Sequence, residues 1–207
     1  MPKTTPAIIA TLFLSVSGFA QVADTPLNAA VLDSFQVRYV ANLSAGDAAV
    51  NLTNSGSNGG FDPAGDMCAN VYVFAQDQQL TGCCACPLTP NHLKTLSVQK
   101  DLISNTLTPG IPTAITVALV ATVGGGTCNA ATIQSADLRS GLRAWGTSLH
   151  VLPGGGFGVG ETEFSPVILS KSEFTKLTSY CGFIQAIGSG YGICGSCRNG
   201  ASGAERQ

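Results

Sequence analysis

Apolar and polar residues alternate in short runs along most of the chain. The first run lies in residues 35–43, and Val50 and Leu52 repeat the alternation after the turn residues 44–47. A period of two residues is typical of a strand with one buried face. The pattern therefore predicts a strand in residues 35–43 and a return strand through Val50 and Leu52.

The next apolar run predicts a central hairpin. Residues 71–75 are apolar on both faces, as expected of a strand that is covered on both sides. The polar residues 76–79 can turn the chain, and centring the hairpin on that turn places residue 69 opposite residue 86. Further strands are predicted around residues 96–98, 111–123, 145–151 and 164–169, with glycine-rich loops at residues 54–65 and 153–160.

One late segment has helical spacing. Ser170 and Glu173 have the spacing of a capping box. In this motif the side chain of the first residue caps the helix, and a glutamate follows three residues later. Apolar residues then recur every three or four positions, at Phe174, Leu177, Cys181 and Ile184. We expect an amphipathic helix over residues 171–187, with this apolar stripe buried and Gly188 at its end.

Many short strands with turns between them, followed by one helix, predict a mostly β fold. We expect an antiparallel β-sandwich, immunoglobulin-like or jelly-roll-like, in a single domain of residues 21–197 that is stapled by disulfides. The polar residues 198–207 are expected to form a flexible tail.

The first twenty residues resemble an export signal. Lys3 provides a positive start, residues 7–16 are apolar, and the small residues Gly18 and Ala20 precede a cleavage position before Gln21. We therefore expect a secreted or cell-surface protein with residues 1–20 removed. No later run is apolar and long enough to predict a membrane span.

The chain has eight cysteines, all after the predicted leader: Cys68, Cys83, Cys84, Cys86, Cys128, Cys181, Cys194 and Cys197. An even number of cysteines in an exported chain predicts disulfides, here four. A zinc site built from residues 83–86 and 194–197, or a redox pair at residues 194 and 197, is the alternative.

The predicted hairpin and helix suggest how the cysteines pair. Opposition of residues 69 and 86 brings Cys68 close to Cys86, within bridging distance. Because Cys181 lies on the apolar stripe of the helix, its partner should lie on the sheet beneath, with Cys128 as first choice. Cys194 and Cys197 would then tie the segment after the helix to the cluster at residues 83–86.

The low charge of the chain and its few candidate catalytic residues restrict the classes of function that it can have. Asp, Glu, Lys and Arg make up 11% of the chain, with net charge −2 and no basic cluster, which disfavours nucleic-acid binding. His150 has no G-x-S-x-G nucleophile setting around it. The carboxylate pairs Glu161/Glu163 and Asp62/Asp66 are more typical of solvated acids than of a glycosidase or a calcium site. We expect no catalytic residue, no metal and no cofactor.

Two further patterns concern glycans. Asn42 and Asn51 begin N-glycosylation sequons and fall on the polar faces of their predicted strands. Trp145 and Tyr191 are the candidates for stacking on a ligand such as a sugar ring.

Residues 37–43 (VRYVANL), 180–184 (YCGFI) and 190–197 (GYGICGSC) resemble a group of uncharacterised secreted bacterial proteins with a late cysteine cluster. The resemblance implies bacterial export and a single domain, and it implies no activity. We expect a secreted, non-enzymatic structural or interaction protein, for example a subunit of a surface layer or filament that associates with itself. One alternative is a β module that binds a carbohydrate, another ligand or a protein partner. A further alternative is a secreted hydrolase.

Overall fold

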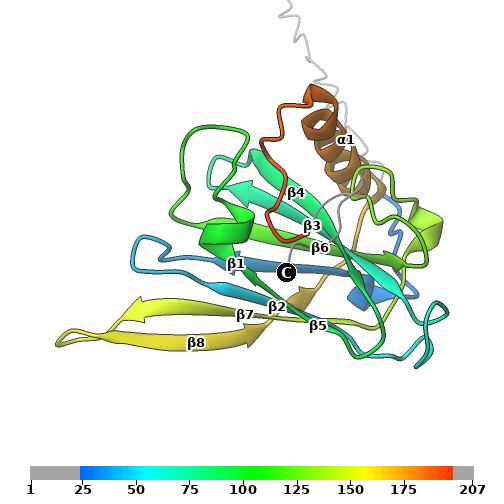
Figure 1. Ribbon diagram of the computed structural model, residues 1–207, viewed down its shortest axis with the longest axis horizontal. Coiled ribbons are helices and arrows are strands. Elements are labelled where there is room, and N and C mark those ends of the chain that lie inside the picture. The colour runs from blue at the N-terminus through cyan, green and yellow to red at the C-terminus, as the bar shows by residue number, and fades with distance from the viewer. Residues whose placement is uncertain (1–23, 198–207) are drawn as a thin grey trace, which may run out of the picture.

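The computed structural model describes residues 24–197. The predicted leader at residues 1–20 and the predicted tail at residues 198–207 lie outside this range. Two antiparallel sheets form the body of the molecule, with strand orders β4-β3-β6-β1-β9 and β5-β2-β7-β8 (Figure 1). The expected mostly β fold of two antiparallel sheets with one C-terminal helix is therefore confirmed.

The five-stranded sheet consists of β1 (Phe35–Val40), β3 (Met67–Ala75), β4 (Leu80–Leu88), β6 (Ile115–Val123) and β9 (Ser165–Pro166). The four-stranded sheet consists of β2 (Ala49–Asn54), β5 (Leu93–Ser97), β7 (Leu142–Val151) and β8 (Phe157–Glu163). The helix is α1 (Lys171–Ile187). Short helical turns lie at Leu32–Ser34, Val98–Leu102 and Ser135–Asp137. In this part of the chain, no helix is long and apolar enough to cross a membrane.

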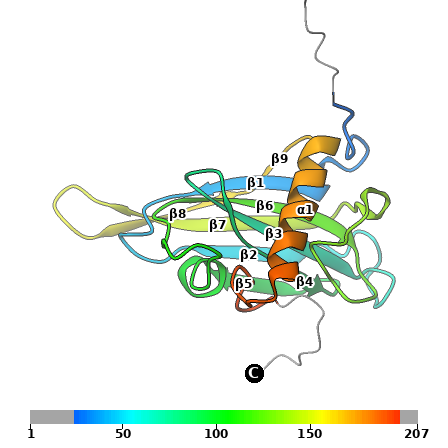
Figure 2. The same ribbon diagram turned by 90° about the horizontal axis from the view of Figure 1, so that it is seen from above.

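The elements form three layers. The two sheets face each other across one core, which includes Val71, Leu119 and Leu52. The other face of the five-stranded sheet is covered by α1, and residues such as Tyr72 and Leu177 form a second core there (Figure 2). Strands β3 and β6 are covered on both sides, which explains why their sequences are apolar at nearly every position.

The central hairpin of β3 and β4 has the predicted register. Ala69 lies opposite Cys86, and Val71 lies opposite Cys84. A bulge between Val73 and Phe74 shifts the pairing near the turn. The prediction succeeds because the polar residues 76–79 are the only turn signal between two buried apolar runs, so the register has little freedom.

The predicted pairing of the first strand with the return strand through Val50 and Leu52 is wrong. β1 pairs with β6 and β9, whereas β2 pairs with β5 and β7, so the two strands belong to different sheets. The intervening residues carry the chain from one layer to the other. Alternation of apolar residues identifies strands, but it does not say which strands pair.

The glycine-rich segment at residues 153–160 is only partly a loop. β7 and β8 form a hairpin in which Val151 lies opposite Phe157, and the connection spans residues 152–156. Three consecutive glycines there, Gly154, Gly155 and Gly156, have positive φ angles of 93°, 95° and 87°, which a side chain would disfavour. The predicted strand at residues 164–169 is reduced to the two residues of β9.

The helix has the predicted bounds and caps. The Ser170 side chain accepts a hydrogen bond from the Glu173 N–H (3.1 Å), and Gly188 ends the helix in the left-handed conformation with φ 65°. Of the predicted stripe, Leu177, Cys181 and Ile184 are buried against the sheet, and Phe174 is half-buried at the margin.

Candidate functional site: cysteines, pocket and a projecting hairpin

All eight cysteines are paired, as predicted. The four disulfides are Cys68–Cys128, Cys83–Cys181, Cys84–Cys194 and Cys86–Cys197. No free cysteine remains. Since every cysteine sulfur is bonded to another, no thiolate is left to hold zinc, and Cys194 and Cys197 do not form a redox pair with each other.

The predicted Cys68–Cys86 bridge is wrong although the predicted register is right. Cys86 lies opposite Ala69, so Cys68 is one position away from the facing residue. Successive side chains of a strand point to opposite faces. Cys86 therefore enters the core between the sheets, whereas Cys68 lies on the helix side and bonds to Cys128, with Cα atoms 5.6 Å apart.

The partner of Cys181 lies on the sheet, as expected, but it is Cys83 and not Cys128. Cys83 lies on the helix side of β4, directly under the buried stripe of α1, and the two Cα atoms are 5.8 Å apart. Periodicity describes local structure and does not say which distant cysteine lies beneath the helix, so it could not identify Cys83.

The segment after the helix is tied to the 83–86 cluster, as predicted. Cys194 bonds to Cys84 and Cys197 bonds to Cys86, both on the core side of β4. On the way, Gly192 accepts a hydrogen bond through its carbonyl from the Cys83 N–H (2.8 Å). The segment thus crosses the outer edge of β4 and covers part of it.

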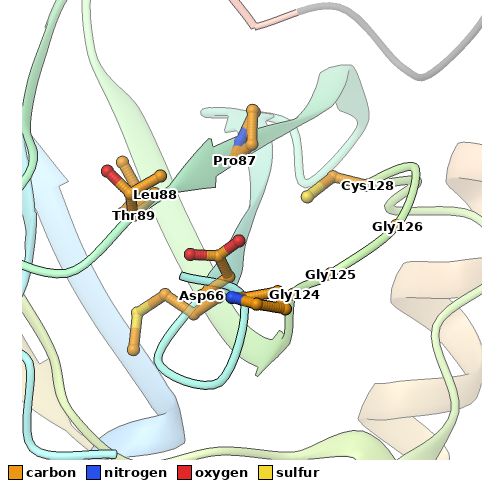
Figure 3. Close-up of a pocket in the computed structure, with 10 residues that line it drawn as sticks. Asp66, Pro87, Leu88, Thr89, Gly124, Gly125, Gly126 and Cys128 are labelled. Carbon is orange, nitrogen blue, oxygen red and sulfur yellow. The ribbon is translucent and has the colours of Figure 1, made fainter. Parts of the chain in front are cut away.

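A pocket of about 320 Å³ lies at the end of the sandwich where β3 begins and β4 and β6 end. Figure 3 shows Asp66 between Leu88 and Thr89 on one side and Gly124 on the other. The full lining is Pro63, Asp66, Met67, Pro87, Leu88, Thr89, Gly124, Gly125, Gly126 and Cys128. Asp66 is the single charged residue of this lining.

An arginine binds the backbone of the loop that carries Asp62 and Asp66, the pair considered for calcium or catalysis. The guanidinium of Arg139 donates to the carbonyls of Ala64 (2.8 Å) and Asp66 (3.0 Å), which occupies oxygens that a calcium ion would use. Burial, followed by the hydrogen bond and the charge of Asp62, raises the pKa of Asp66, and Arg139 partly offsets the rise. Within residues 24–197, no group of three metal-binding side chains occurs.

His150 does not meet a nucleophile and an acid. Its ring lies across Gly158, where an added Cβ would approach Nε2 at 2.3 Å. Ser148, on the same face, instead accepts a hydrogen bond from Arg38 (3.2 Å). The His150 imidazole has no hydrogen bond to another side chain within the described part of the chain, so the geometry gives no triad.

The other carboxylates and the sequons lie around the four-stranded sheet. Glu163 forms an ion pair with Arg143 (3.7 Å), and the Glu161 carboxylate lies 3.5 Å from the side-chain nitrogen of Asn51. Asn51 is half-buried in β2, whereas Asn42 is exposed at a turn and donates to the Leu149 carbonyl (3.1 Å). Glycosylation of either asparagine stays a prediction, and Asn42 is the more accessible.

Trp145 and Tyr191 are not brought together. Trp145 is half-buried on the outer face of the four-stranded sheet. Tyr191 is exposed and follows α1, next to Gly192, which bonds to the outer edge of β4 in the five-stranded sheet. They form no shared stacking platform.

The hairpin of β7 and β8 projects from the body of the molecule in both views (Figures 1 and 2). β8 is the last strand of its sheet, so one of its edges is open. Around the tip, four apolar side chains are exposed: Val151 (66%), Leu152 (41%), Phe157 (56%) and Val159 (68%). Sequence reasoning missed this surface because residues 153–160 look like a loop, although the alternation of Phe157 and Val159 continues that of β7.

A second exposed apolar surface lies on α1. Tyr180, Phe183 and Ile187 are spaced so that they share the helix face turned away from the sheet, and all three are exposed. The helix and the hairpin tip lie far apart in both views (Figures 1 and 2). Such clustered apolar surfaces are typical of interaction sites.

Comparison of the chain with models of protein families, with curated proteins and with solved structures gives no match. Its function is therefore inferred from the sequence and the geometry.

Proposed function

We propose that the protein is a secreted, non-enzymatic interaction protein that serves as a subunit of an extracellular assembly. The observation that carries the proposal is the β7–β8 hairpin, which projects from the sandwich with an open strand edge and exposed apolar side chains. Open edges attract other strands, and natural proteins usually protect them with charge, proline or a covering loop. Here the tip residues Phe157 and Val159 are unprotected.

Three further features support the proposal. Four disulfides fit an oxidising compartment. The second apolar surface on α1 is remote from the hairpin, and two separate contact surfaces are what an extended assembly needs from each subunit. The candidate catalytic groups His150, Asp66 and Glu163 each interact with a different part of the structure, which disfavours the hydrolase alternative.

Electron microscopy and light scattering of the purified secreted protein test this proposal. We expect oligomers or ordered polymers, and we expect Val159→Lys, which places a charge on the open edge, to disperse them. Trp145→Ala is the matched control, because Trp145 lies on the same sheet but away from the tip, and it should leave the assemblies intact.

Two other outcomes would contradict the proposal. A monomer that binds glycans and loses that binding in Trp145→Ala would favour a carbohydrate-binding module. Hydrolysis of a substrate that is lost in His150→Ala would overturn the non-enzymatic part of the proposal.

A further inference from the structure

The backbone of β8 presents a regular row of free hydrogen-bonding groups. At its two ends, Leu152 donates to the Gly156 carbonyl (3.1 Å) and Phe164 donates to the Ala144 carbonyl (2.9 Å). Residues of an antiparallel ladder alternate between pairs that exchange hydrogen bonds and pairs that do not. The even-numbered residues of β8 therefore bond to β7, and its odd-numbered residues turn their N–H and C=O groups outward.

The other sheet ends are less available. The edge of β4 is crossed by the C-terminal segment, with a bridge between Cys83 and Ile193 and two disulfides. β9 has two residues and β5 has five, whereas β8 has seven. Among the described strands, β8 is thus the longest one with an open edge.

From this edge, and on the basis of the function proposed above, we propose that β8 pairs antiparallel with β8 of a second copy around a two-fold axis at Gly158. In this register Phe157 of each copy lies opposite Val159 of the other. The odd-numbered residues of both strands face each other, so their outward N–H and C=O groups can exchange hydrogen bonds across the axis.

The side chains select this register. Within one copy, Val151 lies opposite Phe157 and Leu149 lies opposite Val159. Pairing about Gly158 extends each of these pairs into a row of four apolar side chains across four strands, from Val151 and Phe157 of one copy to Val159 and Leu149 of the other. Cross-strand pairs of aromatic and aliphatic residues are the unit of sheet stabilisation.

Registers that move the axis toward the two glutamates are less favourable. An axis at Val159 would place Phe157 opposite Glu161, and an axis at Gly160 would place Val159 opposite Glu161. With the axis at Gly158, Glu161 and Glu163 face the loop residues Gly155 and Pro153 of the second copy, and no carboxylate lies opposite another. The same patch meets itself, so the contact closes as a dimer.

Single cysteines test the register. Because the eight native cysteines are paired, an added cysteine is the one free thiol among the described residues. We expect Gly158→Cys to form a disulfide-linked dimer under mild oxidation, since residue 158 faces its own copy across the axis. Gly160→Cys, two residues along the same face with open space around it, is the matched control and should remain monomeric. Both changes are made in a His150→Ala background, so that the ring over Gly158 does not interfere.

Light scattering over a concentration series tests the association itself. We expect wild-type protein to dimerise, Val159→Thr to retain the dimer, and Val159→Lys to raise its dissociation constant by at least about tenfold. Val159 is exposed, so unchanged thermal unfolding should show that the lysine variant is folded.

The outcomes separate this inference from the proposed function. Assemblies that Val159→Lys disperses, combined with cross-linking of Gly160→Cys or of neither variant, would overturn the register and leave the proposed function standing. Wild-type protein that stays monomeric at about 1 mM, without cross-linking of Gly158→Cys, would overturn both.

Discussion

Cys83 and Cys84 are neighbours in the chain, yet their side chains leave β4 on opposite faces and bond to different layers of the molecule. Cys83 bonds to Cys181 of α1, and Cys84 bonds to Cys194 in the segment after the helix. One strand thus fixes the helix on its outer side and the C-terminal segment on its core side. The connections span 98 and 110 residues of the sequence, so they also restrict the unfolded chain strongly.

Paired serine substitutions check this connectivity. Cys83→Ser with Cys181→Ser removes both ends of one bridge and should leave no free thiol by mass spectrometry after alkylation. Cys84→Ser with Cys181→Ser removes one end of two different bridges and should leave two labelled thiols. The first variant should lose about 2–5 kcal/mol of unfolding free energy. Free thiols in the first variant and none in the second would show a different pairing.

The buried stripe of α1 should contribute strongly to stability. Leu177 is completely buried against the five-stranded sheet, so Leu177→Ala removes methyl groups from the second core and should cost about 2–5 kcal/mol. Phe183→Ala, on the exposed side of the same helix, is the control and should change the unfolding free energy by less than about 0.5 kcal/mol. Denaturant unfolding measures both. Equal costs would mean that the helix is not docked as described.

The buried side chain of Asn54 forms hydrogen bonds with three backbone segments. Its buried amide donates to the carbonyls of Gly65 (2.8 Å) and Leu88 (3.0 Å), and its side-chain oxygen accepts from Gly56 N–H (2.9 Å). Asn54→Ala leaves these groups without partners and should cost about 1–3 kcal/mol in denaturant unfolding. The half-buried Asn51→Ala, which loses a contact with Thr95, should cost at most about 1 kcal/mol. An Asn54→Ala variant as stable as Asn51→Ala would contradict this role.

Asp66 should make stability depend on pH. Its folded-state pKa is raised from the ordinary value of 3.8, so the folded protein binds a proton more readily than the unfolded chain. Stability from this group is present at low pH and is lost as pH rises through the window that begins near 3.8. Asp66→Asn, which stays neutral, should therefore be more stable than wild type at pH 7, with the difference vanishing below the ordinary pKa.

Thermal unfolding of the two proteins from pH 3 to pH 7 measures this difference. Asp62→Asn should act in the same direction, because it removes the neighbouring charge that disfavours ionisation of Asp66. A lower stability of Asp66→Asn at pH 7 would mean that the Asp66 carboxylate is stabilised, not disfavoured, by its surroundings.

The features that could be predicted from sequence are the local ones. The helix at residues 171–187 follows from the spacing of Leu177, Cys181 and Ile184 together with the Ser170 cap, and the β3–β4 register follows from a single turn. Both depend on residues close together in the chain, where periodicity carries the information.

Long-range relationships could not be predicted in the same way. The pairing of β1 with β6 and the bond from Cys68 to Cys128 depend on how distant segments stack. A shift of one residue moves a side chain to the opposite face of a strand, which is why a correct register still gave the wrong partner for Cys68. The projecting hairpin was missed for another reason, since Gly158 and Gly160 make β8 resemble the loop before it.

The closure of the β4 edge by the C-terminal segment has a practical consequence for making the protein. In the reducing cytoplasm of a production host, Cys84 and Cys86 would not be joined to Cys194 and Cys197, and a nine-residue strand at the end of the five-stranded sheet would lose its cover. Its row of unpaired backbone groups would be available to other chains in addition to β8. Two free edges on one molecule permit chains of contacts that do not close. Insoluble product is the expected result, whereas export to an oxidising compartment before folding should yield protein in which the β4 edge stays covered.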